Sequence, residues 1–263
     1  MASSPPAVLA FAASDPTGGA GLQADLLTLA SLGCHPLSVL TAITAQDTRG
    51  VDGLLALDPA WITRQARILL ADIPAAGFKL GVLGSAPNAR AVAEILAERP
   101  GTPVVLDPVL ASGRGDALAD AETIEVLRGA LLPRTTVLTP NSLEARRLAD
   151  AAPDADLPAC ARQLAKLGCK YVLVTGAHET TAEVVNTLYD ARGVLREDRW
   201  PRLPGSHHGS GCTLASAIAA LLVKGLAVER AVQQAQEYTW HALAAAFSPG
   251  RGQAIPDRFF NSR

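Results

Sequence analysis

The regular alternation of short apolar runs with amphipathic helical patterns constrains this chain of 263 residues more than any other feature. The apolar runs predict buried strands at residues 7–13, 36–44, 78–83, 104–107, 136–138 and 171–175. Helical patterns lie between and after these runs, at residues 21–32, 59–70, 88–98, 121–131, 143–149, 159–167, 212–224 and 228–247. Strands that alternate with helices predict an α/β fold, in which helices cover both faces of a central, mostly parallel sheet. Residues 184–200 break the alternation, because two extended runs there flank residues 190–193, which predicts a small antiparallel hairpin at a sheet edge.

The composition narrows the class of protein and its setting. The chain carries no linker-like stretch, charge block or internal repeat, so we expect one domain over residues 1–263, with residues 1–6 as a disordered tail. Its 23 basic and 25 acidic side chains give a net charge of −2, which argues against nucleic acid as a partner. No apolar run reaches about 18 residues without interruption, which argues against a membrane span. The four cysteines form no C-x-x-C pair, so they indicate neither a zinc ribbon nor a disulfide framework, and free thiols fit a cytoplasmic protein.

Polar and glycine residues follow most of the predicted strands. Ligands of open α/β sheets bind beyond the carboxyl ends of the strands, so these segments predict a cleft. The segments are residues 14–21, 45–50, 107–108, 139–144, 175–178 and 207–212.

The first of these segments contains Gly19-x-Gly21-x-x-Ala24, which matches the dinucleotide fingerprint in form. Five residues separate the first glycine from the strand, and the expected acidic residue at the end of the second strand is missing, which weakens the nicotinamide interpretation. The glycines either permit a loop with positive φ or let a small substrate approach the backbone while Asp25 faces it. No G-x-x-x-x-G-K-[ST] motif is present, which excludes a Walker-type NTPase.

The glycine turn Gly209-Ser210-Gly211 precedes a predicted helix. Successive N–H groups of such a turn form an anion hole at the positive end of the helix dipole, where a phosphate can bind. Cys212 falls in the first turn of this helix, so we expect the dipole to lower the pKa of its thiol. The alternative is that Cys212 is a small core residue.

Asn141 and Glu144 are three residues apart, so both side chains can point from one helix face. Their oxygens suit Mg²⁺, and the same pair can form a capping box, so both roles remain open. Asp107 ends a strand and either supports the metal site without touching the metal or is only a turn residue. His207, His208 and Cys212 resemble part of a zinc site, but a fourth ligand is not evident.

Six motifs together carry a family resemblance. Residues 14–25 (SDPTGGAGLQAD) resemble the N-terminal signature of the hydroxymethylpyrimidine/phosphomethylpyrimidine kinases, which belong to the ribokinase-like superfamily. The other blocks follow in family order at residues 44–51 (TAQDTRGV), 79–83 (KLGVL), 106–109 (LDPV), 139–144 (TPNSLE) and 208–212 (HGSGC). They cover the chain from about Val8 to about Phe247. The resemblance implies a ribokinase-like fold, which agrees with the predicted strand and helix pattern.

The resemblance also implies a function and a set of site residues. It implies ATP- and Mg²⁺-dependent phosphorylation of 4-amino-5-hydroxymethyl-2-methylpyrimidine and then of its monophosphate, in thiamine biosynthesis, by a homodimer. The implied roles are a pyrimidine pocket at Ala13, Ala20, Asp25, Gln46, Val82 and Val109; an anion hole and catalytic cysteine at Gly209, Ser210, Gly211 and Cys212; Mg²⁺ at Asp107 and Glu144; and the nucleotide at Asn141, Thr175 and Gly176.

Three positions depart from the family pattern. Ala13 replaces a glycine, Val82 replaces a methionine and Thr175 replaces a lysine that contacts phosphate. Three alternatives remain open: a pyridoxal kinase of the cysteine-bearing type, a nicotinamide oxidoreductase and a pyrimidine-binding protein without turnover.

Overall fold

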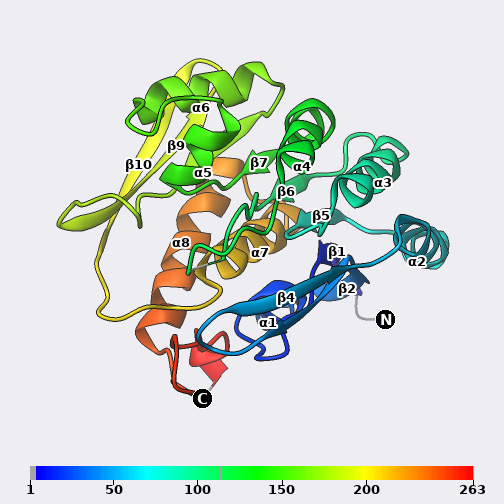
Figure 1. The fold of residues 1–263 in the computed structure, drawn as a ribbon, viewed down its shortest axis with the longest axis horizontal. Helices are drawn as coiled ribbons and strands as arrows, with labels where there is room; N and C mark the ends of the chain where they lie inside the picture. Colours follow the sequence, from blue (N-terminus) through cyan, green and yellow to red (C-terminus); the bar gives the residue numbers. More distant parts are fainter. Residues whose placement is uncertain (1–3, 113, 263) are drawn as a thin grey trace.

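The computed structural model describes residues 4–112 and 114–262. Within them, eight strands form one sheet in the order β10-β9-β8-β7-β6-β5-β1-β2 (Figure 1). The strands from β2 to β8 pair in parallel, whereas β9 pairs antiparallel with both β8 and β10. This arrangement confirms the mostly parallel sheet and the antiparallel hairpin at its edge. The bounds are β1 (Ala7–Ala12), β2 (His35–Leu40), β5 (Gly77–Leu80), β6 (Val104–Leu106), β7 (Val137–Leu138), β8 (Tyr171–Val174), β9 (Glu183–Asp190) and β10 (Gly193–Pro201).

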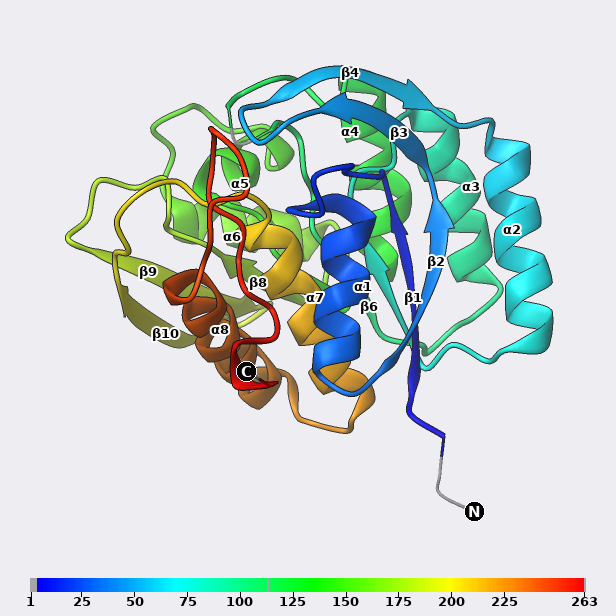
Figure 2. The same cartoon turned by 90° about the horizontal axis from the view of Figure 1, so that it is seen from below.

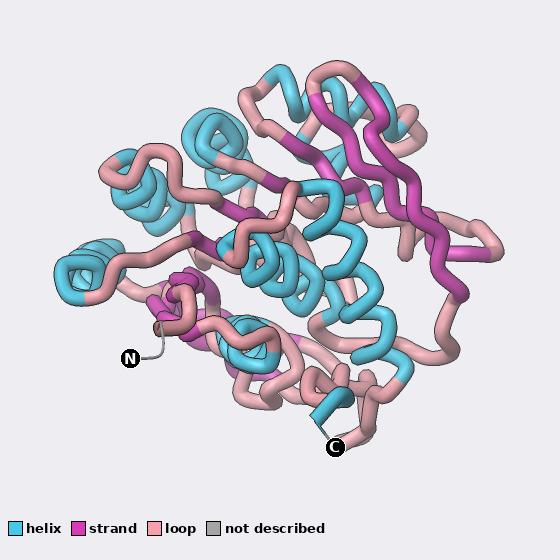
Figure 3. The backbone as a smooth tube through the Cα atoms, turned by 180° about the vertical axis from the view of Figure 1, so that it is seen from behind, coloured by secondary structure: helices cyan, strands magenta, loops and turns pink. Residues whose placement is uncertain are grey.

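Helices cover both faces of the sheet (Figure 3), and the buried side chains form a separate apolar core on each face. One face packs against α1 (Gly21–Ser31), α7 (Ser210–Val223) and α8 (Val228–Ala244). The other face packs against α2 (Pro59–Asp72), α3 (Ala86–Ala97), α4 (Ala121–Val126), α5 (Ser142–Leu148) and α6 (Leu157–Lys166). Among the described helices, none is both long enough and apolar enough to cross a membrane.

A second, smaller sheet departs from the sequence prediction. One strand was expected at residues 36–44, but the chain turns at Thr41, whose hydroxyl donates to the Val82 carbonyl at 2.6 Å. The chain then forms the antiparallel pair β3 (Ala42–Gln46) and β4 (Val51–Ala56), which leaves the main sheet. Figure 2 shows this pair arching away from the parallel strands, over the loops at their carboxyl ends. The alternation of exposed and half-buried residues in β3 reflects this position at the surface.

The helical prediction for residues 121–131 needs a smaller correction. The α-helix α4 ends at Val126, and a π-turn (Leu127–Leu131) and a short 3₁₀ turn (Leu132–Arg134) continue it. Pro133 has no N–H group with which to continue an α-helical ladder. Residues 1–3 of the expected N-terminal tail lie outside the described residues, while Ser4 and Pro5 are exposed.

Candidate active site

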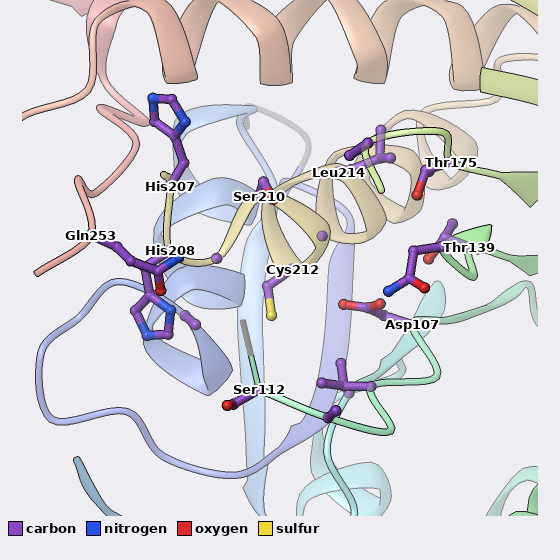
Figure 4. Close-up of a pocket in the computed structure, with 18 of the residues that line it drawn as sticks. Asp107, Ser112, Thr139, Thr175, His207, His208, Ser210, Cys212, Leu214 and Gln253 are labelled. Atoms are coloured by element: carbon purple, nitrogen blue, oxygen red, sulfur yellow. The ribbon is translucent and has the colours of Figure 1, made fainter. Parts of the chain in front are cut away.

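A cavity of about 780 Å³ opens at the carboxyl ends of the parallel strands, as the sequence predicts for this fold (Figure 4). The loops after β1, β6, β7 and β8 contribute to its wall, together with β3, β4 and the first turn of α7. Most of the predicted site residues line it: Ala13, Ala20, Gln46, Val82, Asp107, Val109, Asn141, Glu144, Thr175, Gly209, Ser210, Gly211 and Cys212. Asp25 and Gly176 are the two predicted residues that do not.

The glycine turn that begins α7 has the geometry of an anion site. Gly209 adopts φ +80°, and a Cβ atom there would lie 1.9 Å from the Gly19 carbonyl oxygen, so only glycine fits this position. In the part of the chain that the structure describes, no side chain caps α7, which leaves the N–H groups of its first turn available. These N–H groups, at the positive end of the helix dipole, can bind a phosphoryl group.

Cys212 lies in this first turn, and its sulfur faces the cavity (Figure 4). Burial raises the pKa of the Cys212 thiol to about 12, although the nearby ammonium group of Lys79 acts in the opposite direction. The prediction that the helix dipole lowers this pKa is therefore wrong, because the loss of hydration outweighs the dipole. At neutral pH the resting side chain is a thiol.

Lys79, which lines the cavity, forms an ion pair with Asp25, which does not line it. The side chains of both residues are fully buried, and the Lys79 Nζ lies 2.7 Å from the Asp25 Oδ1. The Ser216 hydroxyl donates to the same carboxylate at 2.9 Å. Burial opposes a charged lysine, but the Asp25 carboxylate outweighs burial and raises the pKa of Lys79 above its ordinary value. The Asp25 carboxylate thus binds Lys79, which corrects the expectation that it faces the substrate.

A carboxyl group, that of Asp107, lies near Cys212, and a second one, that of Glu144, interacts with Asp107. Burial raises the pKa of Asp107 to about 6, and burial together with the Asp107 charge raises that of Glu144 to about 8. The Asp107 Oδ2 atom is buried and accepts no hydrogen bond from the described residues. Figure 4 shows the Asp107 carboxylate pointing toward Cys212.

The pair Asn141 and Glu144 forms the capping box that the sequence allowed. The Asn141 Oδ1 accepts the Glu144 N–H at 2.9 Å, and the Glu144 Oε2 accepts the Asn141 N–H at 2.9 Å. The second carboxylate oxygen of Glu144 accepts the Leu110 N–H at 3.2 Å. Within the described residues, no group of three acidic, histidine or cysteine side chains could hold a metal ion without further ligands.

A second polar pair, Asp15 and His208, was not predicted as part of the site. The His208 Nε2 lies 2.9 Å from the Asp15 Oδ2, which also accepts the Ala20 N–H at 2.7 Å. Burial raises the pKa of Asp15, but hydrogen bonds from His208, Gln46 and Thr17 outweigh it and leave this pKa well below its usual range. Both residues lie in segments that the sequence analysis assigned to the cleft, residues 14–21 and 207–212, and this position could have indicated that they belong to the site.

The wall of the cavity near Thr175 needs one correction to the predicted residues. Thr175 lines the cavity, but the Gly176 N–H donates to the Asn186 Oδ1 at 3.0 Å. A Cβ atom at Gly176 would lie 2.2 Å from the Val185 carbonyl oxygen, so this glycine serves the packing of the hairpin. Trp200 and Trp240 also line this side, and their stacked rings have centroids 6.4 Å apart.

Comparisons with known proteins agree with this geometry. The family model for phosphomethylpyrimidine kinase matches residues 15–257. The hydroxymethylpyrimidine/phosphomethylpyrimidine kinase of Streptomyces coelicolor is 43% identical, and the match covers 94% of this chain and 92% of the relative. The enzyme of the same description from Salmonella typhimurium is 36% identical, with 94% of each chain covered.

Solved structures match over nearly the whole chain. The pyridoxal kinase of Staphylococcus aureus in complex with pyridoxal has a TM-score of 0.91 at 25% identity, covering 99% of this chain and 96% of that one. The phosphomethylpyrimidine kinase of Clostridium difficile has a TM-score of 0.79 at 32% identity, covering 90% of this chain and 99% of that one. These matches confirm the ribokinase-like fold.

Proposed function

Because the chain belongs to the phosphomethylpyrimidine kinase family, we propose that it transfers the γ-phosphoryl group of ATP to 4-amino-5-hydroxymethyl-2-methylpyrimidine and then to the resulting monophosphate. One observation carries the proposal: the uncapped first turn of α7, the Cys212 thiol and the Asp107 carboxylate meet in a single cavity. This arrangement combines an anion hole with groups that can accept a proton.

The proton of the acceptor hydroxyl needs a destination as its oxygen attacks the γ-phosphorus. Cys212 is a thiol at neutral pH, whereas Asp107, whose pKa is about 6, is mostly ionised. In the proposed step the hydroxyl proton moves to the Cys212 sulfur while the thiol proton moves to Asp107, so the pair accepts one proton. The N–H groups of α7 stabilise the charge on the transferred group. This transfer leaves the pair without net charge, because Cys212 is again a thiol and Asp107 becomes a neutral carboxylic acid; before the transfer, the nearby Lys79 ammonium stabilises the charged Asp107 carboxylate.

The residues at this site fit a magnesium ion. Mg²⁺ in nucleotide sites keeps several waters and uses one or two carboxylates together with the phosphates of the nucleotide. Asp107 and Glu144 are the residues that would hold it, since the Asp107 Oδ2 is buried without a hydrogen bond from the described residues. When bound, Mg²⁺ supplies positive charge to the phosphates of the nucleotide.

The acceptor niche lies beside this machinery. Ala13, Val82 and Val109 give it apolar walls, and the Gln46 amide offers a donor and an acceptor to a flat nitrogen heterocycle. Thr175, Asn141 and the two stacked tryptophans line the opposite part of the cavity, where we place the nucleotide.

An ADP-release assay with three acceptors tests the proposal. Hydroxymethylpyrimidine and its monophosphate should both release ADP in a Mg²⁺-dependent manner, with a higher kcat/KM than pyridoxal. The Cys212→Ala variant should lower kcat about 100-fold, whereas Cys160→Ala, which removes a buried thiol of α6 outside the cavity lining, should retain the wild-type kcat. Faster turnover of pyridoxal would identify a pyridoxal kinase, and substrate binding without ADP release would identify a binding protein.

The proposed enzyme is a single-domain cytoplasmic homodimer. The small β3–β4 sheet supports this assembly, because its paired residues Ile43 and Leu55 are 45% and 66% exposed. Two apolar side chains on one outer face favour burial against a second copy. Light scattering should show a dimer, and the double variant Ile43→Lys, Leu55→Lys should be monomeric; an unchanged mass would place the dimer contact elsewhere.

A further inference from the structure

Arg258 lies on the C-terminal segment after α8, and its guanidinium is buried within the molecule. The residue is only 3% exposed, although arginine is almost never buried without partners. Its Nη1 donates to the Gly18 carbonyl at 3.3 Å, its Nη2 to the Gly19 carbonyl at 2.5 Å and its Nε to the Thr213 hydroxyl at 3.1 Å. One side chain thus binds two separate parts of the candidate active site.

These two parts are the loop that carries Asp15 and the first turn of α7. The Thr213 hydroxyl itself donates to the Gly209 carbonyl at 2.8 Å, so the guanidinium is linked to the glycine turn of the anion hole. Gly209 packs directly against the Gly19 carbonyl, at a separation that leaves no space for a Cβ atom. A shift of either part would alter the hydrogen bond between Asp15 and His208, which spans the same junction.

The main chain near Arg258 is fixed by α8. The Tyr238 hydroxyl donates to the Arg258 carbonyl at 2.7 Å, and the Asp257 N–H donates to the Ala242 carbonyl at 2.9 Å. Figure 2 shows the C-terminal segment, in red, running back from α8 across this side of the molecule. Hydrogen bonds from α8 therefore fix the main chain that carries the Arg258 guanidinium.

We propose that Arg258 is a positioning residue for phosphoryl transfer, which holds the Asp15 loop and the anion hole of α7 in their working separation. The proposal rests on the proposed kinase function. A planar guanidinium presents several donors in a fixed fork, and three of them are used here. Lysine offers one point charge in place of this fork and cannot hold all three acceptors in the same geometry.

Steady-state kinetics of Arg258→Lys, compared with the exposed Arg251→Lys on the same segment, test the proposal. Arg258→Lys should lower kcat about 10- to 100-fold, as expected for a small displacement of reacting groups, while the KM for ATP stays near the wild-type value. Arg251→Lys should behave as the wild type. In Arg258→Ala, added guanidinium ion should restore part of kcat, and urea at the same concentration should not.

Hydrogen exchange supplies a readout that does not depend on turnover. Residues 15–21 should exchange faster in Arg258→Lys than in the wild type, and Thr213→Val, which removes one acceptor and keeps the shape, should show a smaller increase. A folded Arg258→Lys with wild-type kcat would overturn the proposal. If the wild type itself releases no ADP, the proposed kinase function is wrong. In that case, hydrogen exchange in residues 15–21 that is the same in Arg258→Lys and in the wild type would separately overturn the positioning role of Arg258.

Discussion

Replacing one member of the buried pair Asp25 and Lys79 should destabilise the protein strongly. Both side chains have no exposed surface, and the ammonium and carboxylate lie 2.7 Å apart. Removing one partner of such a pair leaves an uncompensated buried charge and costs about 3–5 kcal/mol of unfolding free energy. For a chain of this length each kcal/mol shifts Tm by roughly 2–4 °C, so Asp25→Asn should lower Tm by about 6–20 °C.

A double variant separates stability from activity. Asp25→Leu combined with Lys79→Met replaces the pair by apolar side chains and should recover most of the lost Tm, because the desolvation of two charges is no longer required. It should remain inactive, since Asp107 and Cys212 lose their neighbouring cation. Thermal unfolding followed by circular dichroism, together with ADP release, measures both quantities.

The competing interpretation makes the opposite prediction. If Asp25 contacts the pyrimidine, as its place in the N-terminal motif suggested, Asp25→Asn should raise the KM for the acceptor and leave Tm unchanged. A wild-type Tm in this variant would refute the structural argument.

Three further predictions concern the cavity. Cys212→Ala should lower kcat about 100-fold with little change in ATP affinity, and Cys212→Asp should retain more activity than Cys212→Ala. Iodoacetamide should react slowly with Cys212 at pH 7, because the pKa of the thiol is about 12. Wild-type turnover in Cys212→Ala would show that Cys212 is a packing residue. Gln46→Ala should weaken acceptor binding by about 1–3 kcal/mol, and isothermal titration showing an equal loss for ATP would remove Gln46 from the acceptor niche. Since Glu144 has a pKa of about 8, its proton competes with Mg²⁺ below that pH, so the apparent Mg²⁺ affinity should rise from pH 6 to about pH 8 and then level off. Glu144→Gln should lower the apparent affinity for Mg²⁺ and abolish its rise with pH, while the fold remains intact. An unchanged pH profile of Mg²⁺ affinity in this variant would show that Glu144 is only a helix cap.

The main sheet could be predicted from the sequence because the patterns that indicate its strands and helices are local. Apolar runs and helical periods depend on neighbouring residues, and the crossover rule then leaves few topologies. The pair β3 and β4 escaped prediction because its strands lie at the surface and lack a continuous apolar run. The position of the cavity also followed from the sequence, since polar and glycine residues mark the strand ends in the chain itself.

The charges within the cavity could not be predicted in the same way. Asp25 and Lys79 are 54 residues apart in the sequence, and the packing of both α1 and β5 against α7 brings them together. The position of Cys212 in the first turn of a helix was predictable, but its burial was not, and burial decides the sign of its pKa shift. A helix dipole lowers the pKa of a thiol through a partial charge of about half a unit at the helix N-terminus, whereas burial raises this pKa by removing water from the full negative charge of the thiolate.

The resting site therefore keeps most of its acidic groups neutral or paired. The Asp25 carboxylate forms an ion pair with Lys79. Glu144 is mainly protonated below pH 8, and Cys212 is a thiol. Among these four acidic groups, Asp107 therefore carries the one negative charge that has no cation of the described residues in direct contact. A nucleotide triphosphate adds several negative charges to this cavity, and the N–H groups of α7 offer partial positive charges only. The guanidinium groups of Arg114, Arg147 and Arg202 also line the cavity, and a divalent cation held by Asp107 and Glu144 would add further positive charge beside the phosphates. We therefore expect ATP to bind weakly without Mg²⁺, and equal affinity for ATP with and without Mg²⁺ would contradict this account of the site.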